Sequence, residues 1–319
     1  VQILPPRLWR ATSVARFCFA QEMPMSEQEA RELAQKRSEA REARDFAAAD
    51  RIRDQIADLG FEVVDAPEGF ELKPVVPKVR RIHPERVESL LGEQPGNEFS
   101  VQWVVQGWPE DILRGIRSFE SNAGDHSVQQ VVVDAAGTHP SFFPSSVEEI
   151  PLEDDFGWGA DRNAGLRRAD GRIIIVVDGS IEATGDIFSP LAEALADPAV
   201  GVVGPFGIVT DDLREFRESD GPDVDAIEGY LMAFRREVLE EAGMFDEKFK
   251  FYRTADIEYS FRIKEQGYRA VVVPLPVSKH EHRMWQNTPE ADRQRLSKRN
   301  FYRFLERWRG RMDLTVHGE

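Results

Sequence analysis

The chain is short of cysteine, of long apolar runs and of positive charge. Cys18 is the one cysteine among 319 residues, which excludes an internal disulfide framework and a zinc site built from cysteines. No run reaches the roughly 18 apolar residues of a membrane-spanning helix. The net charge of −16, from 57 acidic and 41 basic residues, argues against a surface devoted to nucleic acid. We therefore expect a cytoplasmic globular protein with one large domain or two unequal ones.

The first residues carry an apolar stretch that arginines interrupt, a pattern that disfavours a secretory signal peptide. We expect residues 1–25 to be a disordered leader, or sequence upstream of a start at Met23 or Met25.

Residues 26–75 are predicted to form a small helical hairpin module. Ser26 and Glu29 have the spacing of a capping box, and Asp45 is a second candidate N-cap. Gly60 supplies a left-handed helix stop, and "FEVVDAPEGFEL" then predicts a short β-hairpin.

Within this module, "REARDFAAADRIRDQIADLGFEVVDAPEGFEL" resembles the small C-terminal helical extension of cysteinyl-tRNA synthetases. The resemblance covers residues 26–73. In the synthetases the matching segment lies near the anticodon region of the tRNA. Residues 26–60, however, carry seven Lys and Arg against nine Asp and Glu, a net charge of 7 − 9 = −2, which gives tRNA binding no electrostatic support. We expect a packing or oligomerisation module and no nucleic-acid partner.

Residues 76–98 are rich in proline and charge and are predicted to be a linker. Over residues 99–312, near-continuous apolar runs alternate with helical patterns, which predicts an α/β domain with a mostly parallel sheet covered by helices on both faces. Ligands bind beyond the carboxyl ends of the strands in such sheets. Asp134 and Asp178 each follow an apolar run, so we expect both at that edge.

Four motifs in order resemble those of the family 2 glycosyltransferases, which have the Rossmann-like GT-A fold: "VVVDAAG", "ADRNAGLRRADGRIIIVVDGS", "AIEGYLMAFRREVLEEAGMFDEKFKFYRTADIEYSFRIKEQGYRAVVVP" and "SKHEH". The resemblance spans Phe99 to Arg307. It implies an inverting, hexosyltransferase-type enzyme (EC 2.4) that moves a sugar from a nucleotide-diphosphate donor to a hydroxyl acceptor, which is a glycan, a lipid-linked group or a small molecule.

The resemblance also implies roles at the donor nucleotide. Asp134 matches the acid that contacts the base and ribose, and a carboxylate independently suits ribose hydroxyls because it offers only acceptors. Arg162 and Asn163 match the family's Arg-Asn pair. The alternatives are that Asp134 caps a turn and that Asn163 caps a helix.

Asp178 matches the first acid of the family's Asp-x-Asp element, which holds a divalent cation, Mg²⁺ or Mn²⁺, against the donor diphosphate. The third position of that element is Ser180, a neutral and weaker ligand, and Glu182 is an alternative ligand. His280 is the better match to the family's metal-binding histidine, although His280 and His282 on one face of an extended segment are otherwise more typical of surface residues.

Asp256 matches the family's catalytic base, and Glu258 is a flanking acid. The usual Glu before this Asp is replaced by Ala255, and the alternative is that Asp256 caps the following helix. Glu228 and Gly229 are expected to approach the bound sugar or acceptor.

Residues 279–312 reverse the sign of the chain, with ten Lys and Arg against four Asp and Glu, a net charge of 10 − 4 = +6. Phe301, Phe304, Leu305 and Trp308 have the spacing of one helix face. This helix is expected to pack on the catalytic domain; the alternative is peripheral contact with an anionic membrane.

Two other functions remain open at this point. Ser180 and Ala255 stand where the family usually has acids, which is consistent with a degenerate, non-catalytic nucleotide-sugar binding protein. The third hypothesis is a tRNA-associated protein, and this hypothesis rests on residues 26–73 alone.

Overall fold

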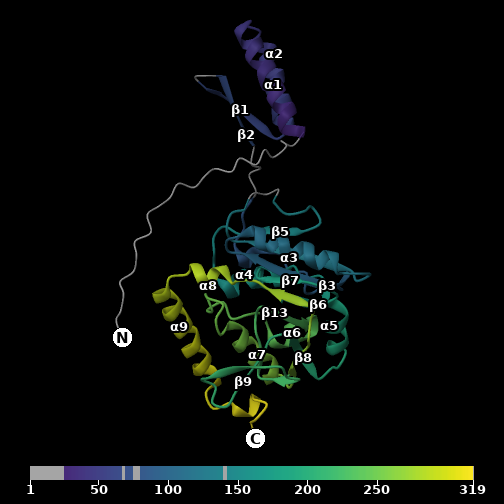
Figure 1. Cartoon of the computed structure of the whole chain (residues 1–319), viewed down its shortest axis with the longest axis vertical. Helices are drawn as coiled ribbons and strands as arrows, with labels where there is room; N and C mark the ends of the chain where they lie inside the picture. Colours follow the sequence, from purple (N-terminus) through teal and green to yellow (C-terminus); the bar gives the residue numbers. More distant parts are fainter. Residues whose placement is uncertain (1–24, 67–68, 75–79, 139–141, 319) are drawn as a thin grey trace, which may run out of the picture. The chain divides into compact units, whose positions relative to one another are not determined.

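The computed structural model describes residues 25–66, 69–74, 80–138 and 142–318 (Figure 1). The chain divides into two compact units, residues 1–77 and 78–319. The expected leader and the start at Met23 lie outside the described residues, while the first helix begins at Met25.

The smaller unit contains two helices, α1 (Met25–Glu42) and α2 (Phe46–Asp58), and the hairpin of β1 (Phe61–Ala66) with β2 (Gly69–Pro74). The carboxylate of Asp45 accepts a bond from the Ala48 amide at 3.0 Å, so the second N-cap is present. Gly60 has φ +83°, the left-handed stop that its place after α2 predicted. The hydrophobic cluster of this unit has Ala30, Ala34, Ile56 and Val63 as its buried members.

The larger unit is built on an eight-stranded sheet with the order β11-β14-β8-β13-β6-β3-β4-β5 (Figure 1). β13 is antiparallel to both of its neighbours, and β11 is antiparallel to β14, so the other six strands share one direction. The strands are β3 (Asn97–Val105), β4 (Val128–Asp134), β5 (Glu148–Pro151), β6 (Gly171–Val177), β8 (Val200–Gly204), β11 (Asp223–Val224), β13 (Leu231–Arg235) and β14 (Arg269–Val272).

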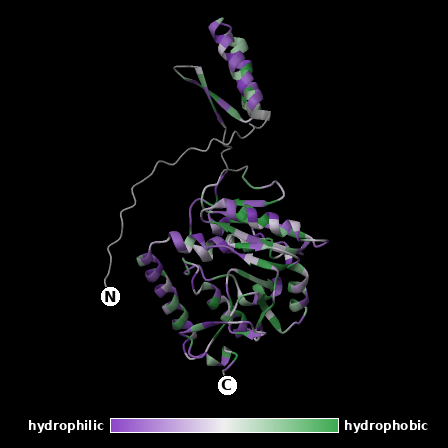
Figure 2. Ribbon diagram, viewed as in Figure 1, coloured by the Kyte–Doolittle hydropathy of each residue, from purple (hydrophilic) through white to green (hydrophobic). Residues whose placement is uncertain are grey.

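Helices cover both faces of this sheet, as the near-continuous apolar strands predicted. Successive residues of β6 alternate between two cores: Ile173 and Ile175 pack with the helices α3 and α5, whereas Ile174 and Val176 pack on the side of α4, α6 and α7. Figure 2 shows the hydrophobic strands enclosed between these layers. The helices are α3 (Pro109–Ser121), α4 (Trp158–Arg167), α5 (Phe188–Leu195), α6 (Arg236–Ala242) and α7 (Ala255–Glu265).

Shorter elements complete the larger unit. The strand β7 (Ile181–Ala183) pairs with β15 (Val277–Lys279), and β9 (Gly207–Thr210) pairs with both β10 (Phe216–Ser219) and β12 (Ala226–Ile227). The remaining elements are the helices α8 (Arg283–Asn287) and α9 (Glu290–Trp308) and the 3-10 helices η1 (Pro84–Arg86) and η2 (Met312–Leu314).

The expected linker differs from the structure over residues 80–98, which belong to the larger unit. Ile82 forms a parallel bridge with Leu152, beside β5. Val87 is buried against Val131 and Ile150. The apolar residues between the charges anchor this segment, so a composition rich in proline and charge did not mark a free linker here.

The C-terminal helix packs on the larger unit. Phe304 and Trp308 of α9 are fully buried in a cluster with Phe261 of α7 and Leu213. The structure thus shows the packing that the sequence analysis expected for this helix. None of the helices in the described ranges is both long and apolar enough to cross a bilayer.

Candidate active site

A cavity of about 260 Å³ opens beyond the carboxyl end of β6, where parallel-sheet folds bind their ligands. Asp178 and Asp256 both line it, together with Glu228, Tyr252 and His282. A smaller adjacent cavity of about 60 Å³ reaches the ends of β3 and the start of α3. Trp158, Asp178, Tyr252 and His282 border both spaces.

Asp178 follows the last residue of β6 and is held by its own turn. Its Oδ1 accepts bonds from the backbone amide of Ser180, at 2.9 Å, and from the Ser180 hydroxyl. Its Oδ2 lies 3.4 Å from Nε2 of His282. Burial would raise the pKa of Asp178, but the bonds from His282 and Ser180 outweigh it and hold the pKa at about 2. The carboxylate is therefore ionised and faces both cavities.

The histidine next to Asp178 is His282, which corrects the expectation of His280. His280 lies 2.6 Å from Glu182 and is 43% exposed. β15 ends at Lys279, and His282 already caps α8, its Nδ1 accepting the Trp285 amide at 3.2 Å. Because the chain turns between these elements, the two histidines do not share the face that an extended segment would give them.

Asp256 lies in the first turn of α7 and points into the larger cavity. Its Oδ2 accepts a bond from the Gly229 amide at 2.8 Å, and its Oδ1 accepts one from Ile257 at 2.9 Å. A Cβ on Gly229 would come 3.3 Å from the Cβ of Asp256, tighter than most such contacts, so glycine permits this approach. Burial raises the pKa of Asp256, against the opposing effect of these two bonds. A carboxylate with this environment is suited to accept a proton.

Glu228 lines the same cavity beside Asp256. Its side chain has no hydrogen bond or ion pair with any residue that the structure describes. Burial, and then the nearby charge of Asp256, raise the pKa of Glu228 to about 7. The cavity therefore holds a second carboxyl group whose charge changes near neutral pH.

We expect Glu228→Gln to stabilise the protein in alkaline solution. The folded pKa of about 7 lies above the unfolded value of 4.5, so ionised Glu228 disfavours the folded state above neutral pH. The variant should gain about 2–3 kcal/mol of unfolding free energy at about pH 8.5, and the gain should vanish near about pH 4.5. Chemical denaturation at both values measures this; an equal difference at both would contradict the assigned environment.

Asp134 does not reach either cavity, contrary to the expectation. Its Oδ1 accepts bonds from Ala136, Gly137 and the Thr138 hydroxyl, each at 3.0 Å, and its Oδ2 accepts the Thr138 amide at 2.9 Å. Oδ2 also lies 3.4 Å from Nη2 of Arg81. The turn-capping alternative is therefore what the structure shows, since both oxygens are occupied by the loop that follows β4.

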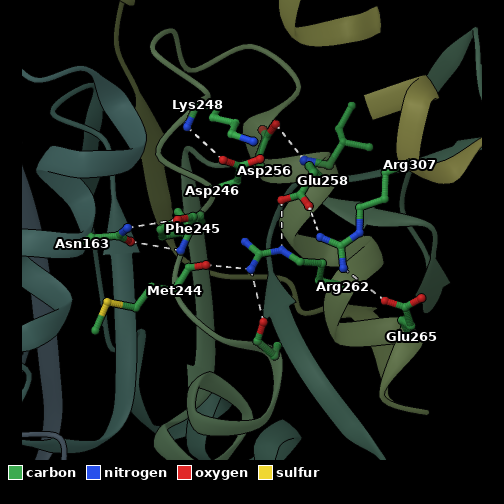
Figure 3. A network of polar contacts seen from close by, with 12 residues as sticks. Asn163, Met244, Phe245, Asp246, Lys248, Asp256, Glu258, Arg262, Glu265 and Arg307 are labelled. Carbon is green, nitrogen blue, oxygen red and sulfur yellow. Dashed lines mark hydrogen bonds and ion pairs between the residues drawn. The ribbon is translucent and has the colours of Figure 1, made fainter. Parts of the chain in front are cut away.

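Asn163 and Glu258 line neither cavity, and Figure 3 shows the polar contacts that they make instead. The Asn163 amide exchanges bonds with the backbone of Phe245, at 2.9 and 3.0 Å, and so anchors the chain after α6. Glu258 is buried and pairs with Arg262 at 3.0 Å and Arg307 at 3.1 Å, which ties α7 to α9. The helical period explains this: two residues after Asp256, the side chain points to the opposite side of α7.

Arg162 borders the smaller cavity, but its guanidinium is used by the backbone. It donates to the carbonyl oxygens of Gln102 at 2.8 Å and Val177 at 2.9 Å, which ties the ends of β3 and β6 together. Its charge faces Asp178 at the same edge.

The sequence motifs missed a polar cluster beside the smaller cavity. The side-chain amide of Gln106 donates to Asp155 at 3.2 Å and to Asp161 at 3.0 Å. Burial, and then the charge of Asp155, raise the pKa of Asp161 to about 7. Gln106 borders the smaller cavity, so its amide oxygen is a candidate contact for a ligand there. The sequence feature that could have indicated Gln106 is its position directly after the apolar strand β3.

The chain is similar in sequence and in fold to known proteins. The family model "Glycosyl transferase family 2" matches residues 125–260. The chain is similar to the crystal structure of GalNAc-T7 with UDP, GalNAc and Mn²⁺, at 17% identity and a TM-score of 0.56, over 66% of this chain and 48% of that one. A mannosyltransferase from Pyrobaculum calidifontis, PcManGT in complex with GDP-Man and Mn²⁺, is similar at 25% identity and a TM-score of 0.43, over 59% and 57% of the two chains.

A further match concerns only 48 residues. They are 46% identical to a cysteine--tRNA ligase of Caldicellulosiruptor saccharolyticus, which is 15% of this chain and 10% of that protein. The chain thus spans about a tenth of this curated relative and about half of the GalNAc-T7 chain. The family 2 model thus matches residues 125–260, which lie in an α/β unit with the GT-A fold.

Proposed function

We propose that this chain is an inverting glycosyltransferase that moves a sugar from a nucleotide-diphosphate donor to a hydroxyl acceptor. The observation that carries the proposal is that Asp178 and Asp256, from the ends of β6 and the start of α7, line one cavity. One carboxylate is ionised and lies at the border with the smaller cavity; the other has a raised pKa and lies in the larger one. The proposed donor diphosphate lies near Asp178, and the acceptor enters beside Asp256.

Asp256 is the proposed general base. The acceptor oxygen forms a bond to the anomeric carbon while the bond from that carbon to the diphosphate breaks on the opposite face. The hydroxyl proton passes to Asp256, and the nucleoside diphosphate leaves with the electron pair of the broken bond. One base is enough for this single displacement, since no covalent sugar–enzyme intermediate forms.

Asp178 and His282 are the residues that would hold a divalent cation. Carboxylate and imidazole suit Mn²⁺, and Mg²⁺ or Mn²⁺ in such sites commonly takes few protein ligands and completes its shell with substrate phosphates. The 3.4 Å between Oδ2 and Nε2 is a separation that two ligands of one ion can adopt. Bound there, the cation would offset the negative charge of the leaving diphosphate. Ser180 is not expected to be a further ligand of the cation, because its hydroxyl donates a hydrogen bond to Asp178.

We expect Ser180→Asp to make stability depend on a cation. A carboxylate at this buried position would replace a hydrogen-bond donor with a second negative charge beside Asp178. In EDTA, the melting temperature of Ser180→Asp should be lower than that of the wild type. Mn²⁺ should raise the melting temperature of this variant by about 4 °C or more beyond any rise in the wild type. Ser180→Asn is the neutral control. Equal responses of the three proteins to Mn²⁺ would contradict a cation site at Asp178.

The release of nucleoside diphosphate from sugar nucleotides tests the proposed activity. We expect release with at least one donor, at a rate that an added hydroxyl acceptor increases. A second candidate function is a non-catalytic nucleotide-sugar binding protein, which Ser180 and Ala255 favour. Binding of a sugar nucleotide with no release, with or without Mn²⁺, would select this alternative.

A further inference from the structure

Two arginines share one aromatic ring and form no ion pair within the described residues, and one of them, Arg253, lines the larger cavity. The guanidinium of Arg253 lies 5.4 Å from the ring centre of Trp285, and that of Arg293 lies 4.7 Å from it. No carboxylate of the described residues forms an ion pair with either side chain. Nε of Arg293 is buried without a hydrogen-bond partner, as is the hydroxyl of Ser297 one turn further along α9. We call Arg253, Arg293 and Trp285 the arginine–tryptophan cluster.

Two other arginines of the C-terminal region do have acidic partners within the described residues. Arg283 pairs with Glu110 and Asp111, and Arg307 pairs with Glu258 and Glu265. The sequence has 57 acidic residues, so acids are not scarce. Two like charges on one ring repel each other, and stacking on the indole offsets only part of that cost. An anion bound by both guanidiniums would offset the repulsion and accept charge-assisted bonds from them.

The cluster is connected to the catalytic cavity through Arg253. This residue lines the cavity that Asp256 also lines. Its charge opposes the rise that burial causes in the pKa of Asp256 and of Glu228. Its backbone carbonyl accepts a bond from Asn300 of α9 at 2.9 Å, which holds the loop before α7 against the helix that carries Arg293. Glu218 and Glu228 also line this cavity and disfavour an anion beside them. A negative group in the cavity is therefore favoured near Arg253.

We propose that the acceptor is anionic, and that Arg253 and Arg293 bind a phosphate group of the acceptor while its hydroxyl lies at Asp256. The place of the hydroxyl rests on the proposed function, whereas the proposed phosphate site does not. Arg253 and Arg293 are binding residues with no part in the proton transfer. The guanidinium fork matches the oxygens of a phosphate, and each charge-assisted bond contributes enough to be measured on its own.

A ligand-observed NMR titration without sugar nucleotide tests the site with two matched probes, glycerol and sn-glycerol 3-phosphate. We expect the phosphate to bind at least about tenfold more tightly than glycerol. Arg293→Gln and Arg253→Gln should each remove about tenfold of this affinity, whereas Arg293→Lys should retain most of it. Arg299→Gln is the matched control, since it removes the same charge from an exposed position of α9 and should leave binding unchanged.

Co-sedimentation with phosphatidylglycerol and phosphatidylcholine vesicles separates a lipid source of phosphate from a soluble one. Sedimentation with the anionic vesicles that Arg293→Gln abolishes would assign the site to a lipid headgroup and support the proposal. Equal affinity for glycerol and its phosphate, with no sedimentation that depends on Arg293, would overturn it. The proposed function fails separately, if no sugar nucleotide binds to the wild-type protein.

Discussion

Asp256→Asn is expected to lower the rate of sugar transfer by about 10²- to 10⁴-fold, the usual contribution of a general base. Asparagine keeps the size of the side chain but cannot take the acceptor proton. The Gly229 amide donates to Asp256 at 2.8 Å, and the single amide oxygen of asparagine can still accept that bond. The loss should therefore appear in kcat, with binding of the nucleotide largely unchanged.

The pH dependence of transfer gives an independent test of the same role. A base acts only when it is ionised, and burial raises the pKa of Asp256 above the ordinary 3.8. The rate of transfer by the wild type should then fall as the pH decreases through this raised pKa. The residual rate of Asp256→Asn should not show this decrease. Unchanged turnover in the variant, with its fold confirmed by an unaltered melting transition, would reject Asp256 as the base.

Trp308→Ala is expected to cost about 3–5 kcal/mol of unfolding free energy. The indole is fully buried, 5.8 Å from the ring of Phe261 in α7, and the guanidinium of Arg307 covers it at 4.5 Å. Its removal would open a large cavity between α9 and α7, the helix whose first turn contains the proposed base.

Tyr302→Ala is the matched control for that loss, because Tyr302 lies on the same helix and is 54% exposed. We expect a change within about 0.5 kcal/mol for this variant. Chemical denaturation of the two variants measures the difference. Equal stability of Trp308→Ala and the wild type would contradict the packing of α9 and reopen the membrane-contact alternative for its apolar face.

The sequence predicted the strands that carry the site better than the roles of the side chains at their ends. The apolar runs before Asp134 and Asp178 are buried strands, because a strand covered on both faces must be apolar along its whole length. Position at a strand end did not decide what each acid does. Asp178 remains at a cavity, while the loop after Asp134 folds back and uses both carboxylate oxygens.

The residues whose roles differ from the expectation depend on tertiary packing that a linear motif does not contain. His282 reaches Asp178 because α8 begins at Arg283 and turns the chain there. Glu258 joins an ion-pair network because α9 brings Arg307 from 49 positions further along the chain. Spacing can place a side chain on a helix face, but which helix covers that face follows from the three-dimensional fold.

Calorimetric titration with sugar nucleotides tests the central claim most directly. At least one sugar nucleotide should bind to the wild-type protein, with tighter binding in Mn²⁺ than in EDTA. Asp178→Ala should weaken this binding, and Asp256→Asn should leave it largely unchanged. Failure of every sugar nucleotide to bind, or equal binding to the wild type and Asp178→Ala, would contradict a donor site at the end of β6.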